Sequence, residues 1–281
     1  MKKSLIILAL LSGLVCAGRG TSAACETVHL GAALSLTGKY AINGALAKKA
    51  YEFTVDRINT DGGLQLAGQC HHIQLKLYDD ESKADRGATL TERLINQDQV
   101  QFVLGPYSSA LMAAIAPVTE KYKVPMVEGL GASRSLFNKG WQYLFAVVST
   151  SEKYLAATID LAAEIANASG KQASDVRLAI VVENDPFSLD VRAGIVEQAV
   201  KYGMEIIIDD KMPRDLTDLS STLTKVKLLR PDLLLVSGHS KGAVTATRQL
   251  AEKDIHVPMV AMTQCESAGI IEKFGEAAEC I

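Results

Sequence analysis

Apolar strand-like runs and helical patterns alternate along almost the whole of this 281-residue chain. Most runs are continuously apolar, which is typical of strands buried on both faces of a sheet. Such strands, each followed by a helix, predict an α/β fold with doubly wound parallel sheets. The expected strands are residues 28–34, 73–78, 100–104, 124–127, 143–148, 177–182, 205–208, 233–237 and 258–261. The expected helices are residues 44–59, 84–96, 110–121, 152–167, 189–202, 219–229, 243–253 and 267–274.

A polar segment, Ser149-Thr150-Ser151, follows one expected strand and leads into a new helix. We place a hinge there, which divides the chain into an N-terminal lobe (residues 25–146) and a C-terminal lobe (residues 147–281) of ordinary domain size. Open α/β sheets bind ligands beyond the carboxyl ends of their strands. Two such edges facing each other across a hinge would form a cleft that closes on a ligand.

The first 24 residues have the pattern of a secretory signal: a positive start, an apolar stretch over residues 4–15 and small residues up to Ala24. We expect cleavage after Ala24, with Ala17 as the alternative, and export to the periplasm. A lipid anchor on Cys16 or Cys25 is the less favoured alternative, because neither follows a good lipoprotein pattern. The net charge of −3 and the lack of a basic cluster argue against nucleic-acid binding.

Export permits disulfides, and four cysteines remain beyond Cys16. Cys25 and Cys70 each precede a strand-like run, so in adjacent parallel strands they would lie at matching strand starts. This placement predicts a Cys25–Cys70 disulfide. Cys265 and Cys280 form a weaker candidate pair, and buried free thiols are the alternative for both pairs.

One junction carries two hydroxyl groups from a strand end into a helix start. The apolar run that ends at Leu104 is followed by Gly105-Pro106-Tyr107-Ser108-Ser109, and a helical pattern begins at Ala110. A helix start has free backbone N–H groups and a partial positive charge, so it favours anions. Ser108 or Ser109 could instead only cap the helix.

A second junction in the next βα unit has the same character, since Gly131 and Ala132 precede another hydroxyl, Ser133. Two hydroxyl-bearing strand ends in neighbouring units could hold one carboxylate between them. Together the junctions predict a site for small acids. Tyr107 is either a wall residue or a partner for an aromatic ring of the ligand.

The chain resembles the type I periplasmic solute-binding proteins of ABC transporters, in particular the group that binds branched-chain amino acids. The resemblance covers residues 26–281 and rests on weak motifs in a specific order: Gly31 to Gly38 with its Ser35-Leu36-Thr37-Gly38 turn, Asp56-Arg57-Ile58-Asn59 to Gly63, Tyr78-Asp79-Asp80-Glu81-Ser82, Gly105 to Ser109, and Gly275-Glu276-Ala277-Ala278-Glu279. It implies a monomeric binding protein with no cofactor, no metal and no catalysis, which delivers its solute to an inner-membrane ABC permease. The chain ends within what would be the last strand of the C-terminal lobe, so it looks truncated.

The resemblance also implies residue roles. Ser109 and Ser133 would hold the ligand carboxylate, with Ser108, Gly131 and Ala132 beside them. Phe187, His239 and approximately Thr263 would close over the ligand from the C-terminal lobe.

Amino-acid binders of this family place an acidic residue near the position of Thr263, where it pairs with the ligand ammonium. Here Glu266 comes a few residues late. Since an unpaired buried ammonium is costly, this departure favours an aromatic acid over a branched-chain amino acid.

Two other functions compete with solute capture. Gly238-His239-Ser240-Lys241-Gly242 matches the G-x-S-x-G elbow of serine hydrolases. The later Asp254 and His256 fall in the next loop, at the opposite sheet edge, so Ser240 lacks a positioned base and a tight glycine turn is the simpler interpretation. A ligand sensor on the same fold is the third possibility. Adjacent His71 and His72 point to opposite faces of a strand and cannot easily share a metal ion. The acidic run from Asp79 to Glu81 is expected to cap a helix or to lie in solvent.

Overall fold

The computed structural model describes residues 25–265 and 268–275. Strands and helices alternate through the described residues, as the sequence predicts. In chain order they are β1 (Glu26–Leu34), α1 (Ala41–Thr60), β2 (Leu64–Leu66), β3 (Gln69–Asp79), α2 (Ala84–Asn96), β4 (Phe102–Leu104), α3 (Ser109–Tyr122), β5 (Met126–Glu128), α4 (Arg134–Phe137), β6 (Leu144–Ala146), the 3₁₀ turn η1 (Ser151–Lys153), α5 (Ala156–Ala168), the 3₁₀ turn η2 (Ala173–Asp175), β7 (Arg177–Glu183), α6 (Pro186–Tyr202), β8 (Glu205–Met212), α7 (Ser220–Leu229), β9 (Leu233–Ser237), α8 (Ser240–Glu252), β10 (Met259–Met262) and α9 (Ala268–Phe274).

Two separate sheets confirm the doubly wound α/β fold. The N-terminal sheet has the strand order β2-β3-β1-β4-β5-β6, and the C-terminal sheet has the order β10-β9-β7-β8. In each sheet the order reverses beside the first strand of the lobe, between β1 and β4 and between β7 and β9. Ligands of open α/β sheets bind at this kind of switch point.

One edge of the N-terminal sheet differs from the prediction of purely parallel strands. The short strand β2 pairs antiparallel with β3, with Leu64 opposite His71 and Leu66 opposite Gln69. Ala67 and Gly68, both at positive φ, form the tight turn of this hairpin. No clear sequence signal marks this hairpin, because β2 has only three residues and alanine rarely adopts positive φ.

Alternating side chains of β7 separate the core of the C-terminal lobe into two layers. Leu178, Ile180 and Val182 face the cluster built with α5 and α6, whereas Ala179 and Val181 face the cluster built with α7 and α8. In the N-terminal lobe, α2 and α3 cover one face of the sheet and α1 covers the other. Both sheets are therefore covered on both faces, which explains their continuously apolar strands.

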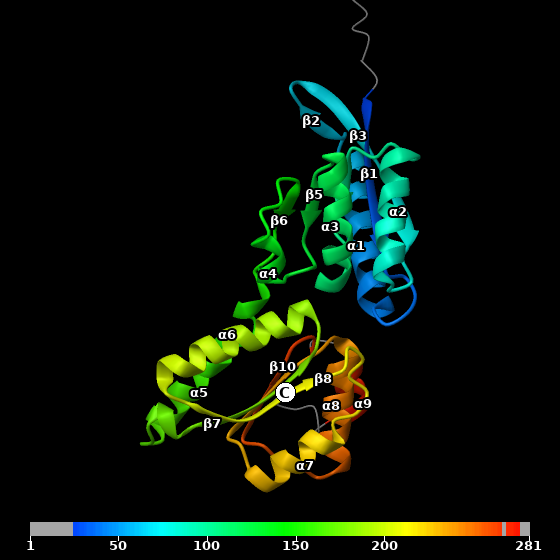
Figure 1. Ribbon diagram of the computed structural model, residues 1–281. Helices are drawn as coiled ribbons and strands as arrows, with labels where there is room; N and C mark the ends of the chain where they lie inside the picture. Colours follow the sequence, from blue (N-terminus) through cyan, green and yellow to red (C-terminus); the bar gives the residue numbers. More distant parts are fainter. Residues whose placement is uncertain (1–24, 266–267, 276–281) are drawn as a thin grey trace, which may run out of the picture.

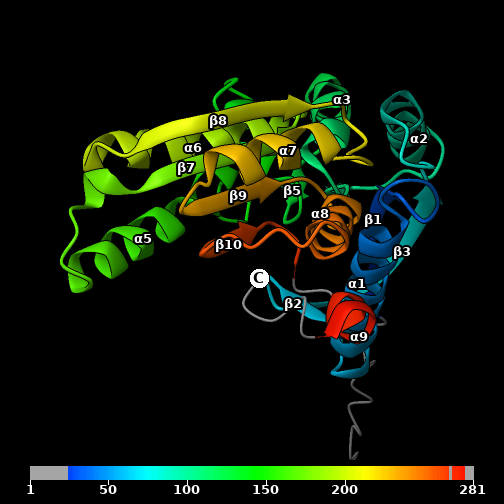
Figure 2. The same cartoon turned by 90° about the horizontal axis from the view of Figure 1, so that it is seen from below.

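The two lobes lie one above the other in Figure 1, with α6 of the C-terminal lobe next to α3 and α4 of the N-terminal lobe. Figure 2, turned by 90°, shows β8, β7, β9 and β10 of the C-terminal sheet side by side. Ser240, at the start of α8, bonds to Asn43 of α1. The carboxyl ends of the central strands β1, β4, β7 and β9 are followed by the loops that meet between the lobes.

The disulfide between Cys25 and Cys70 is present. Its basis is the expected strand pairing: β1 and β3 run parallel, with Thr27 opposite His72 and Val28 opposite Ile73. The weaker candidate pair involves Cys280, which lies outside the described residues.

None of the described helices has the length and apolar character needed to cross a membrane.

Candidate functional site

The junction between β4 and α3 places its two serines differently. Ser108 is the N-cap of α3, and its Oγ accepts a hydrogen bond from the backbone N–H of Leu111 at 3.3 Å. Its backbone has φ 98° and ψ 142°, a conformation that residues other than glycine rarely adopt. Backbone strain of this kind is concentrated at binding and active sites. Ser109 follows as the first residue of the helix and is buried.

The structure brings Ser109 and Ser133 together, as the two-junction hypothesis requires. Ser109 Oγ accepts a hydrogen bond from the backbone N–H of Ser133 at 3.1 Å. The hydroxyl of Ser133, however, donates to Asp190 Oδ2 at 2.5 Å and to the carbonyl oxygen of Pro186 at 3.2 Å. Both acceptors belong to α6, so Ser133 connects the two lobes.

A buried carboxyl group supports the loop that carries Gly131 and Ala132. Glu128 Oε1 accepts the backbone N–H groups of Leu130 (2.8 Å) and Gly131 (2.7 Å). Burial raises the pKa of Glu128 to about 8, although these backbone hydrogen bonds act to lower it. A Cβ atom at Gly105 would lie 2.5 Å from the Glu128 carboxyl group, so this glycine allows the close approach of the two strand ends.

In the C-terminal lobe, His239 comes from the end of β9 and Asp185 from the end of β7. His239 Nε2 lies 3.3 Å from Asp185 Oδ2, and Asp185 also caps α6 by accepting the N–H of Ser188 at 3.0 Å. Burial acts to raise the pKa of Asp185, but His239 and the Ser188 N–H outweigh it and lower that pKa. Asp185 thus holds the imidazole of His239 in place.

Aromatic rings from both lobes meet His239. Tyr107 Oη lies 3.3 Å from His239 Nδ1. The ring of Tyr40 lies 4.7 Å from the imidazole and 5.6 Å from the ring of Tyr107, centroid to centroid. The ring of Phe187 lies 5.9 Å from the imidazole of His239, centroid to centroid. We call Tyr40, Tyr107, Phe187 and His239 the aromatic cluster; all four are buried.

Thr263 lies near this cluster, but its hydroxyl bonds to backbone. Thr263 Oγ1 donates to the carbonyl oxygen of Gly238 at 2.9 Å and accepts the N–H of Gly238 at 3.3 Å. It therefore fixes the turn that precedes His239. Glu266, on which the ammonium argument depended, lies outside the described residues.

Sequence reasoning missed four polar residues at the same place: Lys39, Tyr40, Glu183 and Asp185. Lys39 Nζ donates to Glu183 Oε2 across the lobes at 2.5 Å, and Glu183 is completely buried. Burial raises the pKa of Glu183, while Lys39 acts to lower it. Burial also raises the pKa of Tyr40, to about 12. Their position in the sequence could have indicated them, since Lys39 and Tyr40 follow the first strand of one lobe, and Glu183 and Asp185 lie at the end of the first strand of the other.

The ligand atoms of Glu183, Asp185 and His239 lie within 4.8 Å of one another, a donor set that suits a metal ion. The Lys39 ammonium already bonds to Glu183, and Asp185 caps α6. Side chains and backbone of the protein itself therefore pair with the carboxylates of Glu183 and Asp185.

The hydrolase hypothesis finds no geometric support among the described residues. Ser240 Oγ donates to the amide oxygen of Asn43 at 3.1 Å, and an amide oxygen is not a general base. His256 pairs with Asp254 at 3.0 Å, and both side chains are 90% exposed.

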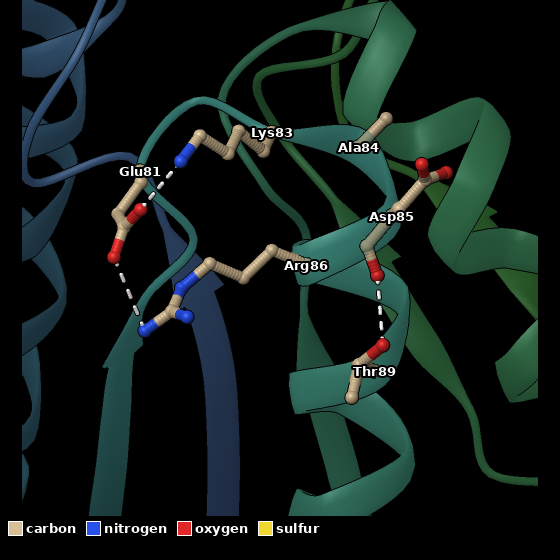
Figure 3. A pocket seen from close by; sticks show the side chains of 6 residues that line it. All are labelled: Glu81, Lys83, Ala84, Asp85, Arg86 and Thr89. Atoms are coloured by element: carbon tan, nitrogen blue, oxygen red, sulfur yellow. Dashed lines mark hydrogen bonds and ion pairs between the residues drawn. The ribbon is translucent and has the colours of Figure 1, made fainter.

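The acidic run Asp79–Glu81, which begins at the last residue of β3, braces the loop between β1 and α1. Asp80 accepts the hydroxyl of Ser35 at 2.6 Å, and Asp79 accepts the N–H of Leu36 at 2.9 Å. Glu81 lies on the surface, where it pairs with Lys83 (2.8 Å) and Arg86 (3.3 Å) beside the shallow pocket of Figure 3. The run thus holds the loop that carries Lys39 and Tyr40.

Comparisons with known proteins agree with this architecture. Residues 27–279 match the periplasmic binding protein family. A Leu/Ile/Val-binding protein homolog from Brucella suis biovar 1 is 24% identical over 253 residues, which make up 90% of this chain and 62% of that protein. The chain thus spans about three fifths of the length of the curated relatives compared with it.

Solved structures share the fold. The branched-chain amino acid substrate-binding protein LivJ from Streptococcus pneumoniae, in complex with isoleucine, has a TM-score of 0.73 and 24% identity, over 84% of this chain and 64% of that one. A solute-binding protein from Rhodopseudomonas palustris BisB5, in complex with 3,4-dihydroxybenzoic acid, has a TM-score of 0.71 and 22% identity, over 84% and 61%. The chain therefore belongs to the periplasmic binding protein family, and it has the two-lobed fold of the substrate-binding proteins of ABC transporters.

Proposed function

We propose that this protein is the extracytoplasmic solute-binding component of an ABC importer, and that it captures a small carboxylate between its lobes. The ligand class is an aromatic acid or a branched-chain amino acid. Family membership supports the proposal, as do structural relatives that hold isoleucine and 3,4-dihydroxybenzoic acid.

The aromatic cluster is the observation that carries the proposal. Tyr40 and Tyr107 come from the switch point of one sheet, and His239 follows β9 at the switch point of the other. Phe187, from the start of α6, packs against the imidazole. A site built equally by two lobes suits a ligand that both lobes enclose.

In this proposal the carboxylate binds at the start of α3, where Ser109 provides a hydroxyl and the helix provides free N–H groups. Ser108, Gly131 and Ala132 line the same end, and Ser133 fixes the lobe contact beside it. Tyr107, Phe187, His239 and Thr263 enclose the remainder of the solute.

Mechanistically, the N-terminal lobe binds the carboxylate first and the C-terminal lobe then closes about a hinge near Ser149-Thr150-Ser151. This assignment places the lobe boundary between residues 146 and 147. The closed monomer would deliver its solute from the periplasm to an inner-membrane permease, without chemistry and without a cofactor.

A panel of solutes tests the ligand class. Thermal unfolding of residues 25–281 would be followed with leucine, isoleucine and valine and, separately, with benzoates and cinnamates. A ligand that binds only the folded state raises the melting temperature. A rise with either class supports a carboxylate carrier, whereas no rise with any of them contradicts it.

Three substitutions, one of them a control, separate binding from hydrolysis. Ser109→Ala should weaken the binding of the solute found in the panel, while Ser174→Ala, at an exposed serine, should not. Ser240→Ala should leave that affinity intact, because catalysis plays no part. Undiminished affinity in Ser109→Ala, measured by calorimetry, would count against the assigned carboxylate site. A sensor on the same fold would bind the same solutes but would require a receptor in place of the permease.

A further inference from the structure

Lys39 forms a partly buried charge pair between the two lobes. Its Nζ atom lies 2.5 Å from Glu183 Oε2, and it also donates to the carbonyl oxygen of Arg214. The side chain of Lys39 is 19% exposed and that of Glu183 is 0% exposed. A pair this buried is screened little by solvent, so each charge depends on the other.

The loop that carries Lys39 is held in place. Gly38 has φ +83°, and a Cβ there would lie 2.7 Å from the carbonyl oxygen of Glu81. On either side of Lys39, Ser82 Oγ donates to the Thr37 carbonyl oxygen at 2.7 Å and accepts the N–H of Tyr40 at 3.0 Å. The backbone on both sides of Lys39 is therefore held in place, which reduces the entropy lost when the side chain pairs with Glu183.

This pair adjoins the proposed solute site. Tyr40, the next residue after Lys39, contacts both Tyr107 and His239 of the aromatic cluster. Glu183 ends β7 two residues before Asp185, which bonds to His239. Any charge on a solute enclosed by the cluster therefore acts on Lys39 and Glu183 through a region with little water.

The carboxylates on this side of the cleft already have partners. Glu183 has Lys39, and its Oε1 accepts the N–H of Leu216 at 3.3 Å. Asp185 has His239 and the N-terminus of α6. An ammonium group on a solute would find both described carboxylates engaged and would lie near another cation.

We propose that Lys39 sets the charge of the accepted solute: by neutralising Glu183 across the lobes, it selects carboxylates that carry no amino group. The inference rests on the proposed function as a carboxylate carrier and specifies its substrate class. In this assignment Lys39 takes the place that a solute ammonium would occupy, and amine-free acids such as aryl carboxylates are the ligands.

Two matched pairs of solutes test the proposal: 4-methylpentanoate with leucine, and 3-phenylpropanoate with phenylalanine. The members of each pair share a carbon skeleton and differ only in the α-amino group. Calorimetry on the wild-type chain should show tighter binding of the amine-free member. Lys39→Met should invert this preference, because Glu183 is then left without a cation. Since a hydrogen bond to a charged group is at stake, the ratio of the two Kd values should change on the order of 10- to 100-fold.

Three further variants control the interpretation. Lys39→Met/Glu183→Gln removes both charges and should restore the wild-type preference. Lys39→Arg keeps the cation and should retain it, which covers the case in which Lys39→Met folds poorly. Lys121→Met removes a lysine from an exposed pair with Glu92 and should leave the ratio unchanged.

The outcomes distinguish this proposal from the function on which it rests. If the wild-type chain binds the amino acid more tightly, or if Lys39→Met leaves the ratio unchanged, the role of Lys39 is wrong while the carrier function stands. If the wild-type chain binds neither member of either pair, nor any acid of the panel, both are refuted.

Discussion

The buried carboxyl group of Glu128 should make the stability of the N-terminal lobe fall as pH rises. In the folded chain its pKa is about 8, against an ordinary value of 4.5, because burial disfavours the charged form. Its Oε2 atom has no hydrogen-bond partner among the described residues. At one pKa unit per 1.36 kcal/mol, this shift corresponds to about 5 kcal/mol at full effect.

The sign of this pH dependence follows from whether the folded or the unfolded chain binds the proton more tightly. Below pH 4.5 the carboxyl is protonated in both the folded and the unfolded chain, so it contributes no pH dependence. Between pH 4.5 and about 8 the unfolded chain loses the proton while the folded chain keeps it. The free energy of unfolding therefore falls with pH in this window, by up to about 1.4 kcal/mol per pH unit.

Glu128→Gln should remove this dependence. The amide stays neutral at every pH, and its oxygen can still accept the N–H groups of Leu130 and Gly131. Relative to wild type, the variant should gain about 3 to 4 kcal/mol between pH 5 and pH 8. Urea unfolding at pH 5, 6, 7 and 8 measures this, followed by the fluorescence of Trp141, the only tryptophan, which packs against the core of the same lobe.

Glu52→Gln provides the control, since the side chain of Glu52 is 45% exposed and pairs with Lys48 one helical turn away. Its stability curve should run parallel to that of wild type. Glu128 does not cause the pH dependence if the Glu128→Gln curve also runs parallel to wild type, or if wild type gains stability over the variant as pH rises.

Two further predictions concern close packing at a glycine and the contribution of the disulfide to stability. A Cβ at Gly194 would lie 1.8 Å from the carbonyl oxygen of Glu152, so Gly194→Ala should cost about 3 kcal/mol or more in urea unfolding. Gly129→Ala, whose Cβ would meet only Val147 at 3.6 Å, should cost less than about 1 kcal/mol; equal losses would contradict the packing argument. Breaking the Cys25–Cys70 bond, which spans 45 residues, should cost about 4 kcal/mol. A reductant should lower the melting temperature of wild type but not that of a Cys25→Ser/Cys70→Ser double variant. The same shift in both would show that the disulfide is not the source of the stability.

Local patterns predicted the elements of the fold well, because the periodicity of strands and helices depends on residues that are close in sequence. Helix starts were predicted less evenly: α1 begins at Ala41, α6 at Pro186 and α8 at Ser240, each three residues before the predicted start, whereas α2 begins at the predicted residue. A cap followed by proline is a recognisable helix start, and Asp185-Pro186 had this form. The apolar pattern alone begins later, because the first turn faces the cleft.

The site was less accessible to sequence reasoning, since its contacts depend on how the lobes face each other. Ser133 was expected to face a ligand, yet its hydroxyl bonds to Asp190 of the other lobe. Lys39 lies in a loop without periodicity, and its partner Glu183 is 144 residues away. Pairings over such separations follow from packing of whole lobes, which no local motif encodes.

The Cys25–Cys70 bond also limits where a lipid anchor could be attached to the mature chain. If cleavage follows Ala24, Cys25 is the first residue of the mature protein, the position at which bacterial lipoproteins carry their lipid. A divalent sulfur joined to its own Cβ and to the sulfur of Cys70 has no valence left for a thioether. Bridging and lipidation at Cys25 therefore exclude each other, and any molecule with the bridge must be anchored through another residue or carry no lipid anchor.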